Sequence, residues 1–186
     1  MLLKQIPNTL TFFRLILIGP FLLFLARRHY QEAFYLFMLA GFTDGLDGWL
    51  ARHFGWQSFL GSFIDPLADK LLVVCSFVAL ALLEQLPWWL VILVFMRDLT
   101  ISIGVIAWYW LIQKKLNFEP TWLSKINTTF QLALITLCLF EIAFIEFSPL
   151  IRLGLLFVTT ITTTLTYFDY VWTWSKKAYA MSNPVK

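Results

Sequence analysis

Long apolar runs alternate with short polar or charged segments along the whole chain. A helix needs roughly 20 apolar residues to cross the hydrocarbon core of a bilayer. Helix is the predicted form of each run, because a lone strand in lipid would leave its backbone groups without hydrogen-bond partners. The six predicted spans cover residues 9–26, 31–52, 59–83, 88–111, 123–145 and 149–172. The pattern therefore predicts an all-α integral membrane protein with six transmembrane helices.

Composition strengthens this interpretation. Of the 186 residues, 60% are hydrophobic, 18% aromatic and only 13% charged, which lies well away from the average of soluble proteins. Almost nothing remains for a soluble domain, so we expect residues 1–186 to form a single membrane domain. The first apolar run could be a signal peptide, but no small-residue cleavage pattern follows Arg27 and Arg28, and we expect it to be retained. The Thr-rich stretch VTTITTTLT in the last span is best explained by helix packing.

Lys and Arg fall unequally between the predicted spans, and cytoplasmic loops of membrane proteins carry the excess. If both termini share one side, only Arg27, Arg28 and Arg152 lie on the opposite side. The side of the termini carries Lys4, Arg52, Lys114, Lys115, Lys125, Lys176, Lys177 and Lys186. Both termini are therefore expected in the cytoplasm, and the short chain without a presequence favours a bacterial inner membrane. The net charge of +3 forms no dense basic stripe, so no nucleic-acid partner is expected.

Four aspartates gather near the cytoplasmic ends of the second and third predicted spans. Residues three, four, seven and eight apart share a face of a helix. By this spacing one face of the second span carries Asp44, Asp47, Gly48, Ala51 and Arg52, and one face of the third carries Gly61, Asp65 and Asp69. The short segment HFGWQSFL joins the two spans, so we expect an antiparallel hairpin that brings the four carboxylates into one pocket at the cytoplasmic side.

Ionised acids packed away from water must be protonated, paired with a cation or bound to a metal. Carboxylates without clustered His or Cys favour magnesium, manganese or calcium. Two such ions could hold a pyrophosphate and stabilise charge on the oxygens being exchanged. An ion or proton path through a transporter is an alternative, although transport sites usually lie near the membrane midplane. The third alternative is a structural cluster neutralised by Arg14, Lys70 or Arg97.

The eight residues on the two helix faces, from Asp44 to Asp69, are spaced along the chain in a pattern that resembles the complete signature of the CDP-alcohol phosphotransferases. That resemblance implies six transmembrane helices, commonly a homodimer, and a cytoplasm-facing site for two divalent ions, Mg²⁺ or Mn²⁺. It implies CDP-diacylglycerol as the donor lipid and CMP as the leaving group. Asp44, Asp47 and Asp65 would be metal ligands, and Asp69 would both lie near the metals and act as the base on the acceptor hydroxyl. The residues that would line the CDP site are Gly48, Ala51, Arg52 and Gly61.

Two further segments bear on the acceptor. IPNTLTFFR, residues 6–14, resembles the branch that contains phosphatidylglycerophosphate synthases and eukaryote-like cardiolipin synthases. PTWLSKINTTFQ, residues 120–131, is more similar to the cardiolipin synthases, because Asn127 stands where glycerophosphate-using enzymes often carry a second Lys. This favours phosphatidylglycerol as acceptor, with glycerol 3-phosphate as the alternative. Candidate contacts to the acceptor phosphate are Arg97, Lys125 and Asn127, although Arg97 could instead form an internal salt bridge with Asp98.

Overall fold

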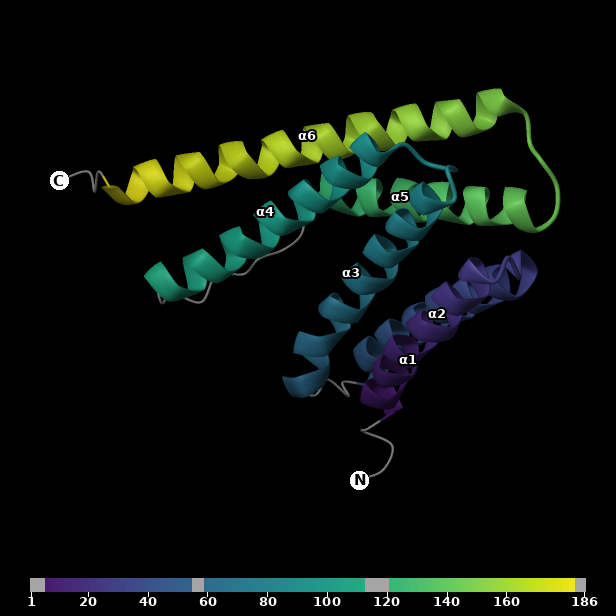
Figure 1. Cartoon of the computed structure of the whole chain (residues 1–186). Coiled ribbons are helices and arrows are strands. Elements are labelled where there is room, and N and C mark those ends of the chain that lie inside the picture. Colours follow the sequence, from purple (N-terminus) through teal and green to yellow (C-terminus); the bar gives the residue numbers. More distant parts are fainter. Residues whose placement is uncertain (1–5, 55–58, 113–120, 183–186) are drawn as a thin grey trace. The chain divides into compact units, whose positions relative to one another are not determined.

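The computed structural model describes residues 6–54, 59–112 and 121–182, and this part of the chain is all-α (Figure 1). Its six helices are α1 (Ile6–Ala26), α2 (Tyr30–Phe54), α3 (Phe59–Leu82), α4 (Trp88–Ile112), α5 (Trp122–Ala143) and α6 (Pro149–Ser182). The all-α class is confirmed, and each helix covers one of the predicted spans closely. The main difference is at the end, where α6 continues past the predicted limit at residue 172.

Two of the described helices are long and apolar enough to cross a membrane. They are α5 over Trp122–Ala143 and α6 over Pro149–Thr173. Phe12–Ala26 forms a shorter apolar helix. The six-span topology, the cytoplasmic position of the site and the orientation of the termini stay predictions.

The chain divides into two compact units, which are described separately. The first unit consists of Met1–Leu86 and Ile135–Ser148, and the second of Pro87–Leu134 and Pro149–Lys186. The helix α5 therefore contributes its first part to the second unit and its last part to the first. The expectation of one membrane domain stays a prediction.

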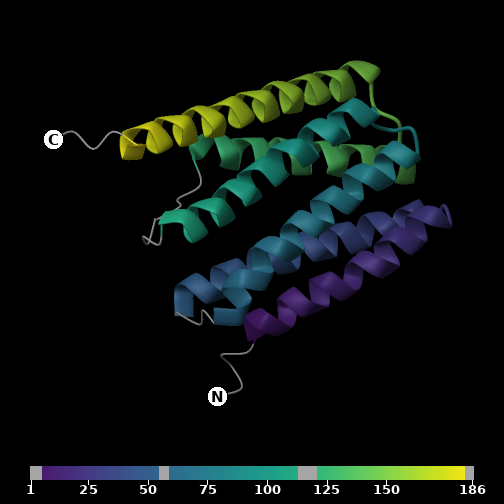
Figure 2. The same ribbon diagram turned by 60° about the vertical axis from the view of Figure 1, so that its left-hand side comes forward.

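In the first unit α1 packs against both α2 and α3, and the two views of the ribbon show α1 lying along α2 (Figures 1 and 2). Leu17, Phe21 and Leu25 form a buried stripe on α1. Small residues on the facing stripe of α2, Ala33 and Ala40, allow the two helices to approach closely. This narrow face is the contribution of α1 to the core of the unit, and α3 adds further buried residues such as Phe77 and Leu80.

The last part of α5 packs on α2 through aromatic side chains. Phe34 of α2 meets Phe140 and Phe144 edge to face, with ring centroids 5.6 and 5.4 Å apart. Gln31 Nε2 donates to the carbonyl of Ala143, at 3.3 Å. These contacts attach the end of α5 to the start of α2.

Two helices of the first unit, α1 and α3, end in backbone turns of the same type. Arg28 after α1 and Glu84 after α3 adopt a left-handed conformation, with φ of 62° and 59°. The next residue closes each turn, since the His29 amide donates to Phe24 O and the Gln85 amide donates to Leu80 O, both at 2.9 Å. This is the Schellman ending of a helix, in which Gly is usual because it has no Cβ. The turn after α1 reverses the chain within a few residues and sets α2 alongside α1.

In the second unit α4 packs against α6. One face of α6 presents buried threonines, Thr159, Thr163 and Thr166, at spacings of four and three residues. Thr159 Oγ1 donates to the Phe130 carbonyl of α5 at 3.4 Å and to Leu155 O within its own helix at 2.8 Å. The Thr-rich stretch therefore contacts α5 at Phe130, as expected if it serves helix packing.

Candidate active site

A buried arginine joins two of the predicted site aspartates in the first unit. Arg14 Nη1 lies 2.9 Å from Asp44 Oδ1 and also pairs with Asp69 Oδ1. The arginine side chain is 0% exposed, whereas those of Asp44 and Asp69 are 47% and 45% exposed. The three residues come from α1, α2 and α3, so three helices converge on one cationic atom.

The local sequence explains this convergence. Arg14 lies three residues before Leu17 and therefore shares the buried stripe of α1. Asp44 lies four residues after the buried Ala40, and Asp69 three residues before the buried Leu72. Each charged residue thus shares a buried stripe with apolar residues of its own helix.

The pairing of Arg14 with Asp44 and Asp69 is electrostatically favourable for the guanidinium and for the two carboxylates. A buried guanidinium needs hydrogen-bonded anionic partners, because its desolvation is otherwise very costly. The side chains of Asp44 and Asp69 are about half exposed, so the pairing with Arg14 does not require two more charges to be fully buried. Carboxylate oxygens that converge on one cationic centre are the donor set that hard divalent ions prefer, so Asp44 and Asp69 fit the expected metal site.

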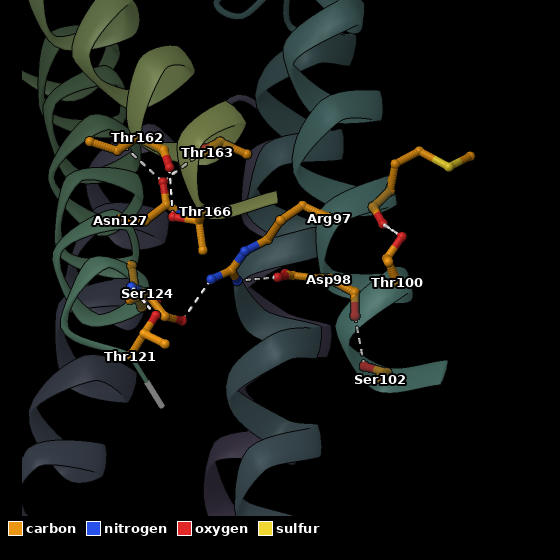
Figure 3. A network of polar contacts seen from close by, with 12 residues as sticks. Arg97, Asp98, Thr100, Ser102, Thr121, Ser124, Asn127, Thr162, Thr163 and Thr166 are labelled. Atoms are coloured by element: carbon orange, nitrogen blue, oxygen red, sulfur yellow. Dashed lines mark hydrogen bonds and ion pairs between the residues drawn. The ribbon is translucent and has the colours of Figure 1, made fainter. Parts of the chain in front are cut away.

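A second polar cluster occupies the second unit and is centred on Arg97 of α4 (Figure 3). Arg97 Nη1 donates to Asp98 Oδ1 at 2.6 Å, and Nη2 donates to Ser124 Oγ of α5 at 2.7 Å. The Arg97 guanidinium carbon lies 6.0 Å from the centre of the Tyr170 ring of α6. The internal salt bridge considered for Arg97 and Asp98 is therefore present, and it leaves the guanidinium in contact with α5 and α6.

Asn127 lies one turn after Ser124 on the same face of α5. Its Oδ1 accepts hydrogen bonds from the hydroxyls of Thr162 at 2.9 Å and Thr163 at 2.8 Å (Figure 3). Lys125, in contrast, is exposed and holds its ammonium 5.4 Å from the centre of the Trp122 ring. Of the three candidate contacts to the acceptor phosphate, Arg97 binds Ser124, which shares a face of α5 with Asn127. Lys125 lies on a different, exposed part of that helix.

The sequence model of the CDP-alcohol phosphatidyltransferase family matches residues 4–174. The chain belongs to this family. The match covers all eight signature residues, so the resemblance found from the sequence is confirmed.

Curated relatives of this chain carry two kinds of name. A probable phosphatidylglycerophosphate synthase of Mycobacterium tuberculosis is 32% identical over 135 residues, which cover 69% of this chain and 63% of that protein. A probable cardiolipin synthase (CMP-forming) of Drosophila melanogaster is 35% identical over 185 residues, or 91% of this chain and 57% of that protein. A CDP-diacylglycerol–glycerol-3-phosphate 3-phosphatidyltransferase of Aquifex aeolicus is 30% identical over 169 residues, which cover 89% of this chain and 93% of that protein.

The matched region spans less than two thirds of the Mycobacterium and Drosophila proteins. Because both kinds of name occur among the relatives, they do not distinguish between the two acceptors.

Two of the signature aspartates, Asp44 and Asp69, are therefore placed together by the structure. The backbone of the remaining signature residues is helical, in α2 and α3. Their side chains lie outside the described part, and they belong to Asp47, Gly48, Ala51, Arg52, Gly61 and Asp65. Among the described residues no group of three His, Cys, Asp or Glu is arranged to hold a metal, and the four-carboxylate site stays a prediction.

Arg14 is the site residue that sequence reasoning named only as a neutralising partner in the structural alternative. It ends the segment IPNTLTFFR, which had served only for the branch resemblance. Arg14 lies three residues before Leu17, seven before Phe21 and eleven before Leu25 and so shares their buried face, but a helix that is apolar all round does not mark that face in its sequence. Gln131, Thr162 and Thr163 were likewise not singled out, and their contacts depend on how α5 and α6 pack.

Proposed function

We propose that this chain transfers a phosphatidyl group from CDP-diacylglycerol to the hydroxyl of a glycerol-type acceptor and releases CMP. The observation that carries the proposal is the convergence of Asp44 and Asp69 on Arg14, within the signature of a phosphatidyltransferase family. Half-exposed carboxylates at the end of a buried helix face are accessible to a charged headgroup. The two acyl chains of such a donor suit apolar helices such as those of this chain.

Each signature residue has a proposed role. Asp69 takes the proton of the acceptor hydroxyl while the acceptor oxygen bonds to the phosphorus of the phosphatidyl group. The bond from that phosphorus to the bridging oxygen breaks, and CMP leaves with the electron pair. Asp44, Asp47 and Asp65, with Asp69, would hold two divalent ions, Mg²⁺ or Mn²⁺, which supply charge stabilisation on the pyrophosphate oxygens. The CDP moiety would contact Gly48, Ala51, Arg52 and Gly61.

Arg14 has a role in this scheme that differs from that of a ligand. Its fully buried guanidinium holds the carboxylates of Asp44 and Asp69 from the side of the helix core. The oxygens that remain exposed are thereby kept facing the substrate side. Orientation of a base by a fixed neighbour contributes to the rate because the base need not be ordered during the reaction.

We propose phosphatidylglycerol as the acceptor, which gives cardiolipin, over glycerol 3-phosphate. In support, the neutral Asn127 lies on the α5 face that meets Arg97, and the charge of Arg97 is already paired by Asp98. Such an environment suits a singly charged phosphodiester better than a doubly charged phosphomonoester. Lys125 is the remaining cation proposed to contact the acceptor phosphate. We further propose a homodimer in a bacterial inner membrane with both termini in the cytoplasm.

The full chain, purified in detergent, tests this function directly. CDP-diacylglycerol and Mg²⁺ or Mn²⁺ are supplied with phosphatidylglycerol or with glycerol 3-phosphate, CMP release is followed, and the lipid product is identified by its mass. The Asp69→Asn variant is expected to release CMP about 100-fold more slowly or worse. Glu146→Gln makes the same chemical change at an exposed position after α5 and should act as the wild type. Full activity of Asp69→Asn would refute its role as the base.

A different result would point to the transporter alternative. In liposomes, proton or cation flux that depends on Asp44 and Asp69 and needs no nucleotide would contradict the enzyme proposal. The enzyme proposal expects no flux above that of empty liposomes, with CMP release only when both lipid donor and acceptor are present.

A further inference from the structure

Arg14 binds one carboxylate oxygen of each of two proposed metal ligands. Its Nη1 lies 2.9 Å from Asp44 Oδ1 and also donates to Asp69 Oδ1. A carboxylate spreads one negative charge over two oxygens, so a contact with either oxygen draws on the charge that a metal ion would use. The guanidinium and a divalent ion therefore depend on the same two side chains.

The guanidinium cannot exchange this contact for water. The Arg14 side chain is 0% exposed and shares the buried face of α1 with Leu17, whereas the side chains of Asp44 and Asp69 are about half exposed. A buried guanidinium that lost its carboxylates would be an uncompensated charge between packed helices, which is strongly unfavourable. An ion held by Asp44 and Asp69 therefore binds beside a fixed positive charge.

Two positive charges at such short range repel each other even where water screens them. For a divalent ion beside a guanidinium, the repulsion at the dielectric constant of water is enough to weaken binding about 10-fold, and a drier site weakens it further. The hydrogen bonds from Arg14 also occupy lone pairs of both Oδ1 atoms, which leaves the two carboxylates as weaker ligands. Both effects act in the same direction, against the ion.

The same contact stabilises the first unit. The helix α1 packs against both α2 and α3, and Arg14 joins the three helices through Asp44 and Asp69. Without a cation, the two carboxylates would repel each other where these helices converge. Arg14 supplies that cation from within the chain, so the packing of the three helices does not depend on a metal ion for neutralisation.

We propose that Arg14 and a divalent ion compete for the carboxylates of Asp44 and Asp69. Arg14 is thereby a positioning residue that sets the metal affinity of the site and takes over part of the ion's stabilising effect on the fold. The competition rests on the metal-binding role that the proposed function gives to Asp44 and Asp69. Because coupling within one site is reciprocal, removal of the guanidinium should strengthen metal binding by the factor by which the ion weakens the guanidinium contacts.

Manganese binding to the full chain in detergent tests the competition without any turnover. Free Mn²⁺ is followed by electron paramagnetic resonance while the ion is titrated into the wild type, Arg14→Gln and the control Arg27→Gln. Glutamine removes the charge and keeps a hydrogen-bond donor, and Arg27 is exposed after α1, away from the two carboxylates. We expect the Kd for Mn²⁺ to fall about 10-fold in Arg14→Gln and to equal the wild-type value in Arg27→Gln.

Asp44→Asn shows where the ion binds. In the wild type and in Arg14→Gln, this substitution should raise the Kd for Mn²⁺, because an amide oxygen is a weaker ligand for a hard cation than a carboxylate oxygen. A Kd that Asp44→Asn leaves unchanged in both backgrounds would place the ion elsewhere and contradict the competition.

Thermal unfolding of the same variants measures the effect of the competition on stability. With EDTA present, Arg14→Gln should unfold at a lower temperature than the wild type, because two carboxylates then lack their charged partner. Saturating Mn²⁺ should raise the midpoint of Arg14→Gln more than that of the wild type and so reduce the difference between them. Arg27→Gln should match the wild type under both conditions. A purely structural role of Arg14 would leave the difference the same with and without the ion.

An equal or higher Kd for Mn²⁺ in Arg14→Gln would overturn the proposal, because the guanidinium would then assist the ion or have no effect on it. Failure of Arg14→Gln to fold in saturating Mn²⁺ would also count against it, since the ion is expected to replace the lost charge. If the Kd values follow the expected order but the wild type releases no CMP with any acceptor, the proposed function fails and the competition stands.

Discussion

The buried guanidinium of Arg14 lies 2.9 Å from the half-exposed carboxylate of Asp44. The same Nη1 atom pairs with Asp69, so one atom of α1 connects a signature residue of α2 with one of α3. The contact between the apolar stripe of α1 and its two neighbours therefore also sets the positions of two proposed catalytic and metal-binding groups. Substitutions of Arg14 should therefore lower both activity and stability, and the replacing residue decides which of the two falls more.

Arg14→Lys is expected to lower CMP release about 10-fold or more with a small change in the unfolding midpoint. Lysine keeps the charge but cannot reproduce the planar fork of a guanidinium that meets two carboxylates. Arg14→Leu should lower both activity and midpoint, because Asp44 and Asp69 then repel each other without a cation. CMP release and thermal unfolding in detergent measure the two effects. Arg27→Lys, at an exposed position after α1, is the control, and equal activity of Arg14→Lys and Arg27→Lys would contradict the proposed role.

Removal of divalent ions should abolish CMP release, and Mg²⁺ or Mn²⁺ should restore it. Asp44→Asn is expected to require a metal concentration about 10-fold higher for half-maximal activity, because a neutral amide oxygen binds a hard cation less strongly than a carboxylate. A metal titration of CMP release measures this for the variant, the wild type and Glu146→Gln. The same half-saturating concentration in all three would exclude Asp44 as a ligand.

Asn127→Lys should change the acceptor preference. A second cation beside Arg97 favours the doubly charged phosphomonoester of glycerol 3-phosphate over the singly charged diester of phosphatidylglycerol. We expect the ratio of kcat/KM for glycerol 3-phosphate to that for phosphatidylglycerol to rise about 10-fold. Parallel assays with both acceptors measure the ratio. Asn127→Leu removes the amide without adding charge. If it shifted the ratio of kcat/KM values as much as Asn127→Lys does, the added charge would not be the cause of the changed preference.

Arg28→Gly and Glu84→Gly should each stabilise the first unit by about 1 kcal/mol. Both residues adopt φ near 60° at the ends of α1 and α3, where a Cβ is unfavourable and glycine carries no such cost. Unfolding in detergent by heat or denaturant measures the change. Arg27→Gly, one residue earlier and without positive φ, is the matched control and should leave stability unchanged or lower it. Stabilisation by Arg27→Gly equal to that by Arg28→Gly would contradict the explanation.

The aspartate signature was readable from the sequence because it depends on local spacing alone. Asp44 and Asp69 occupy fixed positions along helices that the apolar runs define, and eight residues at fixed gaps are specific enough to indicate the family. Placement of Arg97 beside Asp98 was equally local, since adjacent residues of opposite charge can pair within one helix. In each case the information lies within a few helical turns.

The sequence by itself thus determined the six helices, their approximate bounds and the family, because apolar length and residue spacing follow from the geometry of a single helix. Tertiary structure decided which side of each helix faces its neighbours. In a helix that is apolar all round, periodicity does not mark the inward face, so Arg14 could not be assigned to Asp44 and Asp69 from spacing. For the same reason only the packing of α5 against α6 separates the buried Asn127 from the exposed Lys125, two residues earlier.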